Sequence, residues 1–168
     1  MTILYAQPYD LAASGFYYES ADDYAAKAET LRNEYGQPVE EFEIQFIDGE
    51  TIDAQLFEAL GINQCNHGEF FEAVSLWSDD EKVRVIIAVG EVGISFRLGH
   101  DEPDALDIDL YEIDSLSDLA AQFVEDGLFG DIPKAIENYL DYDAIARDLA
   151  MDYGTTTIDS ARYAYRAA

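Results

Sequence analysis

Residues 129–149 read "FGDIPKAIENYLDYDAIARDL" and combine helix signals with an unusual mixture of aromatic and acidic residues. Asp131 and Pro133 are typical of a helix start, because an acidic cap and a proline in the first turn both favour that position. The apolar residues of the stretch then change their helical face near residue 141. We therefore expect two successive helices, with Asp141 capping the second.

Acids gather on one side of this stretch. On an ideal helix, four of them fall within about 60° of one another: Glu137, Asp141, Asp148 and Asp152. Asp143 and Arg147 are spaced to form a favourable i, i+4 ion pair. In most proteins such an acidic arc is only a solvated face. Here paired acids also recur on other predicted elements, at Glu41 and Glu43 and at Asp107 and Asp109.

The flanking segments predict a sheet with packed helices over residues 104–168. "LDIDLYEID" (106–114) is typical of a strand whose alternation changes phase near residues 110–111, where we expect a β-bulge. Ser115 and Asp118 predict the start of a helix that Gly127 ends. The final "TTTIDSARYAYRAA" (155–168) predicts a hairpin that pairs back onto the sheet.

The sequence of the first half of the chain predicts a small sheet crossed by one helix, and then a helical region. Short strands are expected at 2–6 and 15–18, and "EEFEIQFIDG" (40–49) alternates as a half-buried strand does. The helix between them begins at Ser20 and runs through Tyr35 to Gly36. Residues 51–90 have helical spacing, and Ser78 with Glu81 predicts the start of the last helical segment there. An ambiguous segment (91–99) and an acidic linker (100–104) follow.

We therefore expect an α+β chain of three small domains with an elongated arrangement and a negatively charged surface. The expected domains cover residues 1–60 (a small antiparallel sheet plus a helix), 61–103 (mainly helical) and 104–168 (a sheet with packed helices). A chain of 168 residues is long enough to bury a sizeable core, whether in one domain or in several.

The charge balance excludes whole classes of partner. The chain has 36 acids and 9 bases, a net charge of −27. Residues 1–60 hold 13 acids and 2 bases, and residues 101–168 hold 17 acids and 4 bases, so the two ends are the most acidic parts. A nucleic-acid binder or a protein that binds anionic membranes needs a basic surface. The expected partner is therefore cationic.

No motif indicates catalysis or a cofactor. The chain lacks a nucleophile elbow and a phosphate-binding glycine loop, and its acidic runs lack the glycine of a calcium-binding EF-hand. Cys65 and His67 are too few for a zinc site, and we interpret them as a buried thiol and a loop histidine. A lone cysteine and an N-terminus without a signal pattern predict a cytoplasmic protein.

A comparison of charge density with DNA favours a decoy. Duplex DNA carries about two charges per base pair, so a net charge of −27 matches roughly 13 base pairs. Acids two apart on a strand lie about 6.6 Å apart, and acids four apart on a helix about 6 Å apart along the axis. An elongated chain of small domains can therefore display carboxylates at a density near that of phosphates. Alternatives are an acidic metal-binding module and an enzyme that uses paired carboxylates.

The stretch "GDIPKAIENYLDYDAIARDL" (130–149) resembles the ArdA antirestriction proteins, which mobile elements and phages use against type I restriction–modification enzymes. The shared pattern is a glycine, an acid, an apolar residue and a proline, then an Asn-Tyr-apolar-Asp-Tyr run and an Arg-Asp-Leu ending. In this chain it comprises Gly130, Asp131, Ile132, Pro133, Asn138, Tyr139, Leu140, Asp141, Tyr142, Arg147, Asp148 and Leu149. Ala146 stands where family members often have glycine.

The resemblance implies an elongated, curved homodimer, joined through its C-terminal domain, that imitates bent B-form DNA. It implies no catalytic residue, cofactor or metal. The implied partner is the methyltransferase core of a type I enzyme, although a CRISPR effector or a nucleoid protein presents a similar basic groove. The carboxylates that we expect to replace phosphates are Glu41, Glu43, Asp48, Asp107, Asp109, Glu112, Asp114, Asp118, Glu137, Asp141, Asp148 and Asp152. The expected dimer or structural residues are Tyr139, Tyr142, Ala146 and Arg147.

Overall fold

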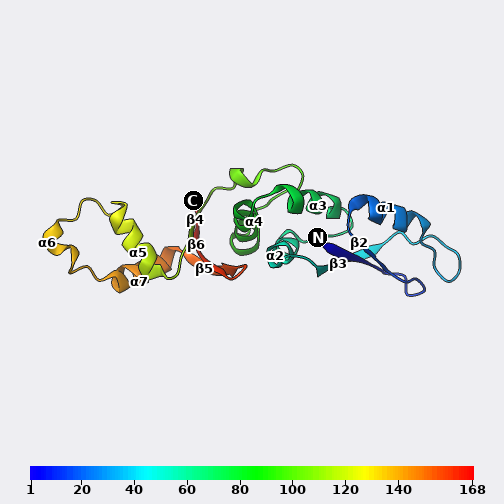
Figure 1. Cartoon of the computed structure of the whole chain (residues 1–168), viewed down its shortest axis with the longest axis horizontal. Helices are drawn as coiled ribbons and strands as arrows, with labels where there is room; N and C mark the ends of the chain where they lie inside the picture. Colours follow the sequence, from blue (N-terminus) through cyan, green and yellow to red (C-terminus); the bar gives the residue numbers. More distant parts are fainter. The chain divides into compact units, whose positions relative to one another are not determined.

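A computed structural model describes all 168 residues, which divide into two compact units, residues 1–106 and 107–168. Seven α-helices and two separate three-stranded antiparallel sheets make up the chain (Figure 1). The predicted α+β class is therefore confirmed. The finer division into three domains stays a prediction.

The N-terminal unit is built on a sheet with the strand order β2-β1-β3. Its strands are β1 (Ile3–Pro8), β2 (Phe16–Tyr18) and β3 (Phe42–Asp48), close to the segments predicted from alternation. Alternate residues of these strands are buried, including Leu4, Ala6, Tyr18, Phe42 and Ile44. One face of the sheet therefore belongs to the core, and the other face is formed by the intervening residues.

Helix α1 (Ala21–Thr30) crosses this sheet and begins at Ser20, whose side chain accepts a hydrogen bond from the N–H of Asp23. The prediction that it extends to Gly36 is wrong, because Leu31 already has an extended backbone. Asn33 explains the early end. Its side-chain oxygen accepts hydrogen bonds from two backbone N–H groups at residues 35 and 37 and thereby favours a turn over another helical turn.

The predicted helical region contains α2 (Thr51–Leu60), α3 (His67–Leu76) and α4 (Asp79–Val85). Ser78 and Glu81 form a reciprocal capping box at the start of α4, which fixes the helix start that the sequence indicates. After α4 the chain continues as a π-helical segment (Ile86–Val92), which packs against α2. The first two residues of the ambiguous segment (91–99) end this π-helix, and the rest of it is irregular. A 3₁₀ turn follows at Pro103–Ala105.

The C-terminal unit contains a second sheet with the order β4-β6-β5. Its strands are β4 (Ile108–Glu112), β5 (Gly154–Ile158) and β6 (Ala161–Ala167), the last two forming the predicted hairpin. The expected bulge in β4 is wrong, because the pairing of β4 with β6 is unbroken. The apparent phase change arises because Leu110 and Tyr111 are both partly buried although they lie on opposite faces.

Three helices complete this unit: α5 (Leu116–Glu125), α6 (Lys134–Glu137) and α7 (Tyr142–Asp152). Ser115 caps α5 and Asp141 caps α7, each by accepting a backbone N–H, as predicted. Asp131 does not cap α6. That single-turn helix begins after Pro133 without a side-chain cap. The core under α5 and α7 consists of Ile113, Leu119, Phe123, Tyr153 and Ala164.

Candidate functional site

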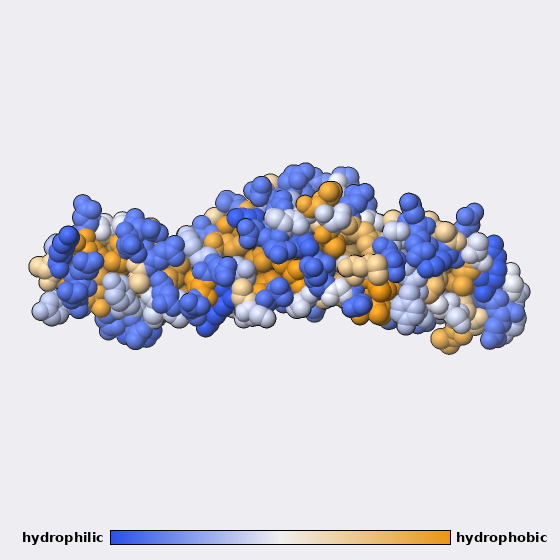
Figure 2. Space-filling view, viewed as in Figure 1, coloured by the Kyte–Doolittle hydropathy of each residue, from blue (hydrophilic) through white to orange (hydrophobic).

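Solvent-exposed carboxylates are the dominant chemical feature of the surface. Of the 36 acids, 30 are exposed and only Asp53 is buried. Several of the nine bases are used internally, since Lys27, Lys82, Arg97 and Arg166 each bind an aspartate. Hydrophilic residues accordingly spread over the visible face of both units (Figure 2). Most of the negative charge therefore has no internal partner.

The three predicted carboxylates of the N-terminal unit lie along β3, which is an edge strand. Glu41 immediately precedes the strand, Glu43 lies opposite Gln7, and Asp48 lies opposite Ile3. All three acids are exposed. The strand therefore presents a row of carboxylates at one edge of the sheet.

The predicted carboxylates on and beside β4 do not form a single row. Asp107, Glu112 and Asp114 are exposed, whereas Asp109 is half-buried. Arg166 of the neighbouring strand binds Asp109 and lies over the Tyr153 ring, 4.8 Å from its centroid. The hydrogen bond to Asp109 raises the pKa of the Arg166 guanidinium. The charge of Asp109 is therefore compensated by Arg166 within the unit. Of the twelve acids expected to replace phosphates, Asp109 is the least available to a partner.

The acids of the helices are exposed and partly used as caps. Asp118 accepts a hydrogen bond from the Ser115 hydroxyl at 2.5 Å, and Asp141 accepts from the N–H of Ala144 at 3.0 Å. Asp148 and Asp152 lie on α7, on the same face as its cap, because they are seven and eleven residues beyond it. The expected arc is interrupted before α7. Glu137, which ends α6, belongs to a different helix.

The predicted structural residues have contrasting environments. Ala146 is buried on α7, which packs on α5, whereas Tyr139 is 85% exposed and Tyr142 is half-buried. Arg147 is exposed and forms no ion pair with Asp143. The Asp143 carboxylate instead accepts a hydrogen bond from the hydroxyl of Ser117 on α5, at 2.7 Å. The expected i, i+4 pair is thus replaced by a contact between helices.

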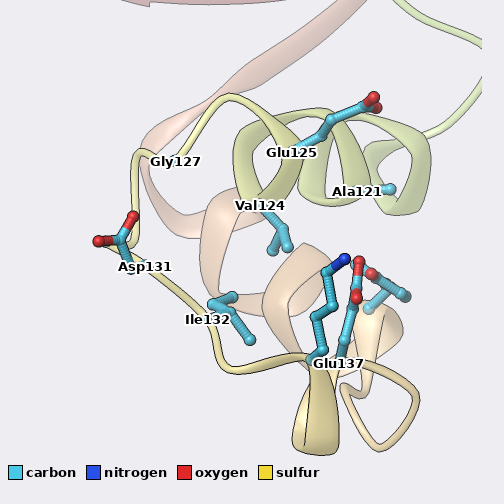
Figure 3. Close-up of a pocket in the computed structure, with 10 residues that line it drawn as sticks. Ala121, Val124, Glu125, Gly127, Asp131, Ile132 and Glu137 are labelled. Carbon is cyan, nitrogen blue, oxygen red and sulfur yellow. The ribbon is translucent and has the colours of Figure 1, made fainter.

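A groove of about 570 Å³ lies between α5, the loop after it and the start of α7 (Figure 3). Val124, Ile132 and Glu137 point into it, whereas Glu125 and Asp131 point away. Three acids and one lysine line the groove, together with small and apolar residues: Ala121, Val124, Glu125, Gly127, Gly130, Asp131, Ile132, Lys134, Glu137 and Tyr142. This lining contains no serine, cysteine or histidine, so it lacks the pairing of a hydroxyl or thiol nucleophile with a histidine base.

Sequence reasoning missed a buried ion pair in the N-terminal unit. The Lys82 ammonium of α4 lies 2.7 Å from the Asp53 carboxylate of α2, and both side chains are almost completely buried. Asp53 also accepts a hydrogen bond from the Thr2 hydroxyl at 3.3 Å. The available signal was helical position, because Asp53 is three residues before Leu56 and shares its buried face.

The interpretation of Cys65 and His67 is reversed by the structure. Cys65 is exposed, whereas His67 begins α3 and is buried against the rings of Tyr18 and Tyr24. Desolvation lowers the pKa of His67. Nowhere in the chain do three or more histidine, cysteine or acidic side chains come together in a way that could hold a metal ion. None of the helices combines the length and apolar character of a membrane span.

Comparison with known families finds a match over most of the chain. The family described as "Antirestriction protein (ArdA)" matches residues 17–163, which is most of the chain. The chain belongs to the ArdA antirestriction family. Members of the ArdA family are antirestriction proteins, and the motif around residues 130–149 lies well inside the matched region. No curated protein matches the chain.

Proposed function

We propose that this ArdA protein imitates B-form DNA and inhibits type I restriction–modification enzymes by occupying the DNA groove of the methyltransferase core. One observation carries the proposal. Eleven of the twelve candidate carboxylates are solvent-exposed, and none of those eleven forms an ion pair within the chain. Such acids are available to the lysines and arginines that normally neutralise DNA phosphates.

The net negative charge of the chain supports a target whose binding site is a groove that holds a DNA duplex. A net charge of −27 corresponds to roughly 13 base pairs, and a homodimer corresponds to roughly twice that length. We infer that the protein acts as a dimer in the cytoplasm, with no catalytic residue and no cofactor. Inhibition is then stoichiometric, because each decoy blocks one groove for as long as it remains bound.

Competition kinetics test this proposal. Cleavage and methylation by a purified type I enzyme are measured at several concentrations of DNA and of inhibitor. Imitation of DNA predicts that added DNA relieves the inhibition of both reactions. Inhibition that DNA does not relieve would place the contact outside the DNA groove. No inhibition at large excess would direct attention to other DNA-binding targets, such as a CRISPR effector or a nucleoid protein.

A further inference from the structure

The outer face of the N-terminal sheet carries tyrosines that imitation of phosphates does not require. Tyr5 of β1 lies opposite Tyr17 of β2, and their ring centroids are 4.7 Å apart with an interplanar angle of 51°. Tyr17 is 59% exposed. Helices α1 and α3 lie along one side of the sheet in Figure 1, and no helix is drawn across the other side. The tyrosine pair therefore lies on the face opposite these helices, with Tyr5 partly buried and Tyr17 exposed.

The local backbone fixes this tyrosine pair. Gly15, immediately before β2, lies against the hydroxyl end of the Tyr5 ring. A Cβ atom at Gly15 would clash with the carbonyl oxygen of Ala6 and would lie 2.5 Å from the Tyr5 hydroxyl oxygen. Only glycine permits this close approach without a shift. The Tyr5 ring thus packs against Gly15 and contacts the ring of Tyr17.

One acid and two amides share this face of the sheet with the two rings. Gln45 lies opposite Tyr5 on the other side of β1, and Glu43 lies opposite Gln7, one pair further along the same face. None of the three strands contains a lysine or an arginine. Lys27 of α1 donates hydrogen bonds to the backbone carbonyl of Tyr17 and to the carboxylate of Asp23, so its charge is already paired. The face is therefore aromatic and negatively charged.

The chemistry of this face fits arginine better than lysine. A guanidinium group is planar, stacks on aromatic rings and pairs with carboxylates, whereas an ammonium group is compact and strongly hydrated. We propose that the face defined by Tyr5, Tyr17, Glu43 and Gln45 binds arginine side chains of the target enzyme. This inference rests on the proposed function, and it adds a short-range contact to the long-range attraction between carboxylates and a basic groove.

Substitution of Tyr17 gives the first test, with inhibition of a type I enzyme as the readout. Tyr17→Ala is expected to weaken inhibition about tenfold, and Tyr17→Phe is expected to retain it because the ring face remains. Tyr35→Ala is the matched control, since Tyr35 is 79% exposed and lies in the turn after α1. The loss is also expected to be the same at all salt concentrations, because no charge is removed. Equal inhibition by Tyr17→Ala and the unchanged protein would overturn the inference.

A second measurement uses the unchanged protein and does not depend on restriction enzymes. Backbone amide NMR shifts are recorded during titration with hexa-arginine and, separately, with hexa-lysine. The inference predicts that hexa-arginine moves the signals of Tyr5, Tyr17 and Gln45 at lower concentrations than hexa-lysine does. Equal responses to the two peptides would overturn it.

These tests separate the inference from the proposed function. If the unchanged protein fails to compete with DNA, the proposed function is wrong, and the peptide titration still decides whether the face prefers arginine. If the unchanged protein competes but Tyr17→Ala competes equally well, only the inference is wrong. Tyr17→Ala could instead change the oligomeric state in solution without changing inhibition. That result would also overturn the inference, because it would assign the face to contacts between copies of this chain.

Discussion

Lys82 and Asp53 illustrate how a single buried pair depends on both partners. Their charged atoms lie 2.7 Å apart, and removal of one partner leaves the other charge buried without compensation. Lys82→Met is therefore expected to lower the free energy of unfolding of the N-terminal unit by about 3–5 kcal/mol, measured by urea denaturation.

Two controls make this prediction specific. Lys27→Met removes a lysine from a much more exposed pair, with Asp23, and is expected to have a far smaller effect. The double variant Lys82→Met with Asp53→Leu removes both buried charges and is expected to recover most of the lost stability. A Lys82→Met protein as stable as the Lys27→Met protein would show that the pair is solvated.

The burial of the single residue His67 makes the free energy of unfolding depend on pH. Burial lowers the pKa of His67 in the folded state, so the unfolded chain binds a proton more readily. The contribution to stability is fully present above the ordinary histidine pKa of about 6.5 and is lost as the pH falls below it. The groups facing the ring are Tyr18 and Tyr24, with Glu69 on the same helix.

Comparison with His67→Phe isolates this effect from the carboxylates, which titrate at lower pH. The difference in free energy of unfolding between the two proteins is measured by urea denaturation from pH 8 to pH 5. We expect a constant difference at the upper end and a loss specific to the histidine protein toward pH 5. A difference that stays constant throughout would contradict the assigned burial.

At the scale of elements, the helix caps explain where the acidic C-terminal helices begin. Asp141 accepts the N–H of Ala144, and this bond satisfies one of the free donors in the first turn of α7. Asp141→Ala is expected to destabilise the C-terminal unit by about 1 kcal/mol, as measured by thermal or urea unfolding. Asp148→Ala removes an acid from the same helix without removing a cap and is the matched control. Equal stability of the two variants would contradict the capping role.

Elements with strong local signals could be predicted from the sequence. The caps at Ser20, Ser78, Ser115 and Asp141 and the terminal hairpin all depend on neighbouring residues, and the structure contains each of them. The expected end of α1 lies too late in the chain, because apolar spacing does not reveal the competing hydrogen bonds of Asn33. The expected bulge in β4 is absent, and its apolar residues lie on both faces of the sheet, so the sequence does not alternate cleanly.

For the candidate site, the sequence predicts many exposed acids but not the contacts that each of them makes. Exposure of the acids follows from their number, because charged side chains are rarely buried without a partner. The pairing of Asp109 with Arg166 and of Asp53 with Lys82 joins residues that are distant in sequence. Spacing along the chain contains no information about such contacts, and the Tyr5–Tyr17 face depends in the same way on strand register.

At the scale of the whole molecule, many weak contacts imply tolerance of single changes. An exposed ion pair contributes little, so neutralising one exposed acid such as Asp114 is expected to weaken inhibition less than about fivefold. Simultaneous neutralisation of the β3 row, Glu41, Glu43 and Asp48, is expected to have a larger effect and to reduce the salt dependence of inhibition. Inhibition of a type I enzyme at several salt concentrations measures both. A tenfold loss from most single changes would instead indicate a discrete site.

Displacement of DNA tests the central claim most directly. The protein is titrated into a purified type I restriction–modification enzyme bound to a labelled duplex that contains its recognition site, and release of the duplex is followed by fluorescence anisotropy. Imitation of DNA predicts stoichiometric release at moderate salt, and weaker release as salt is added. Retention of the duplex at large excess of folded protein would contradict the claim that this chain occupies the DNA groove.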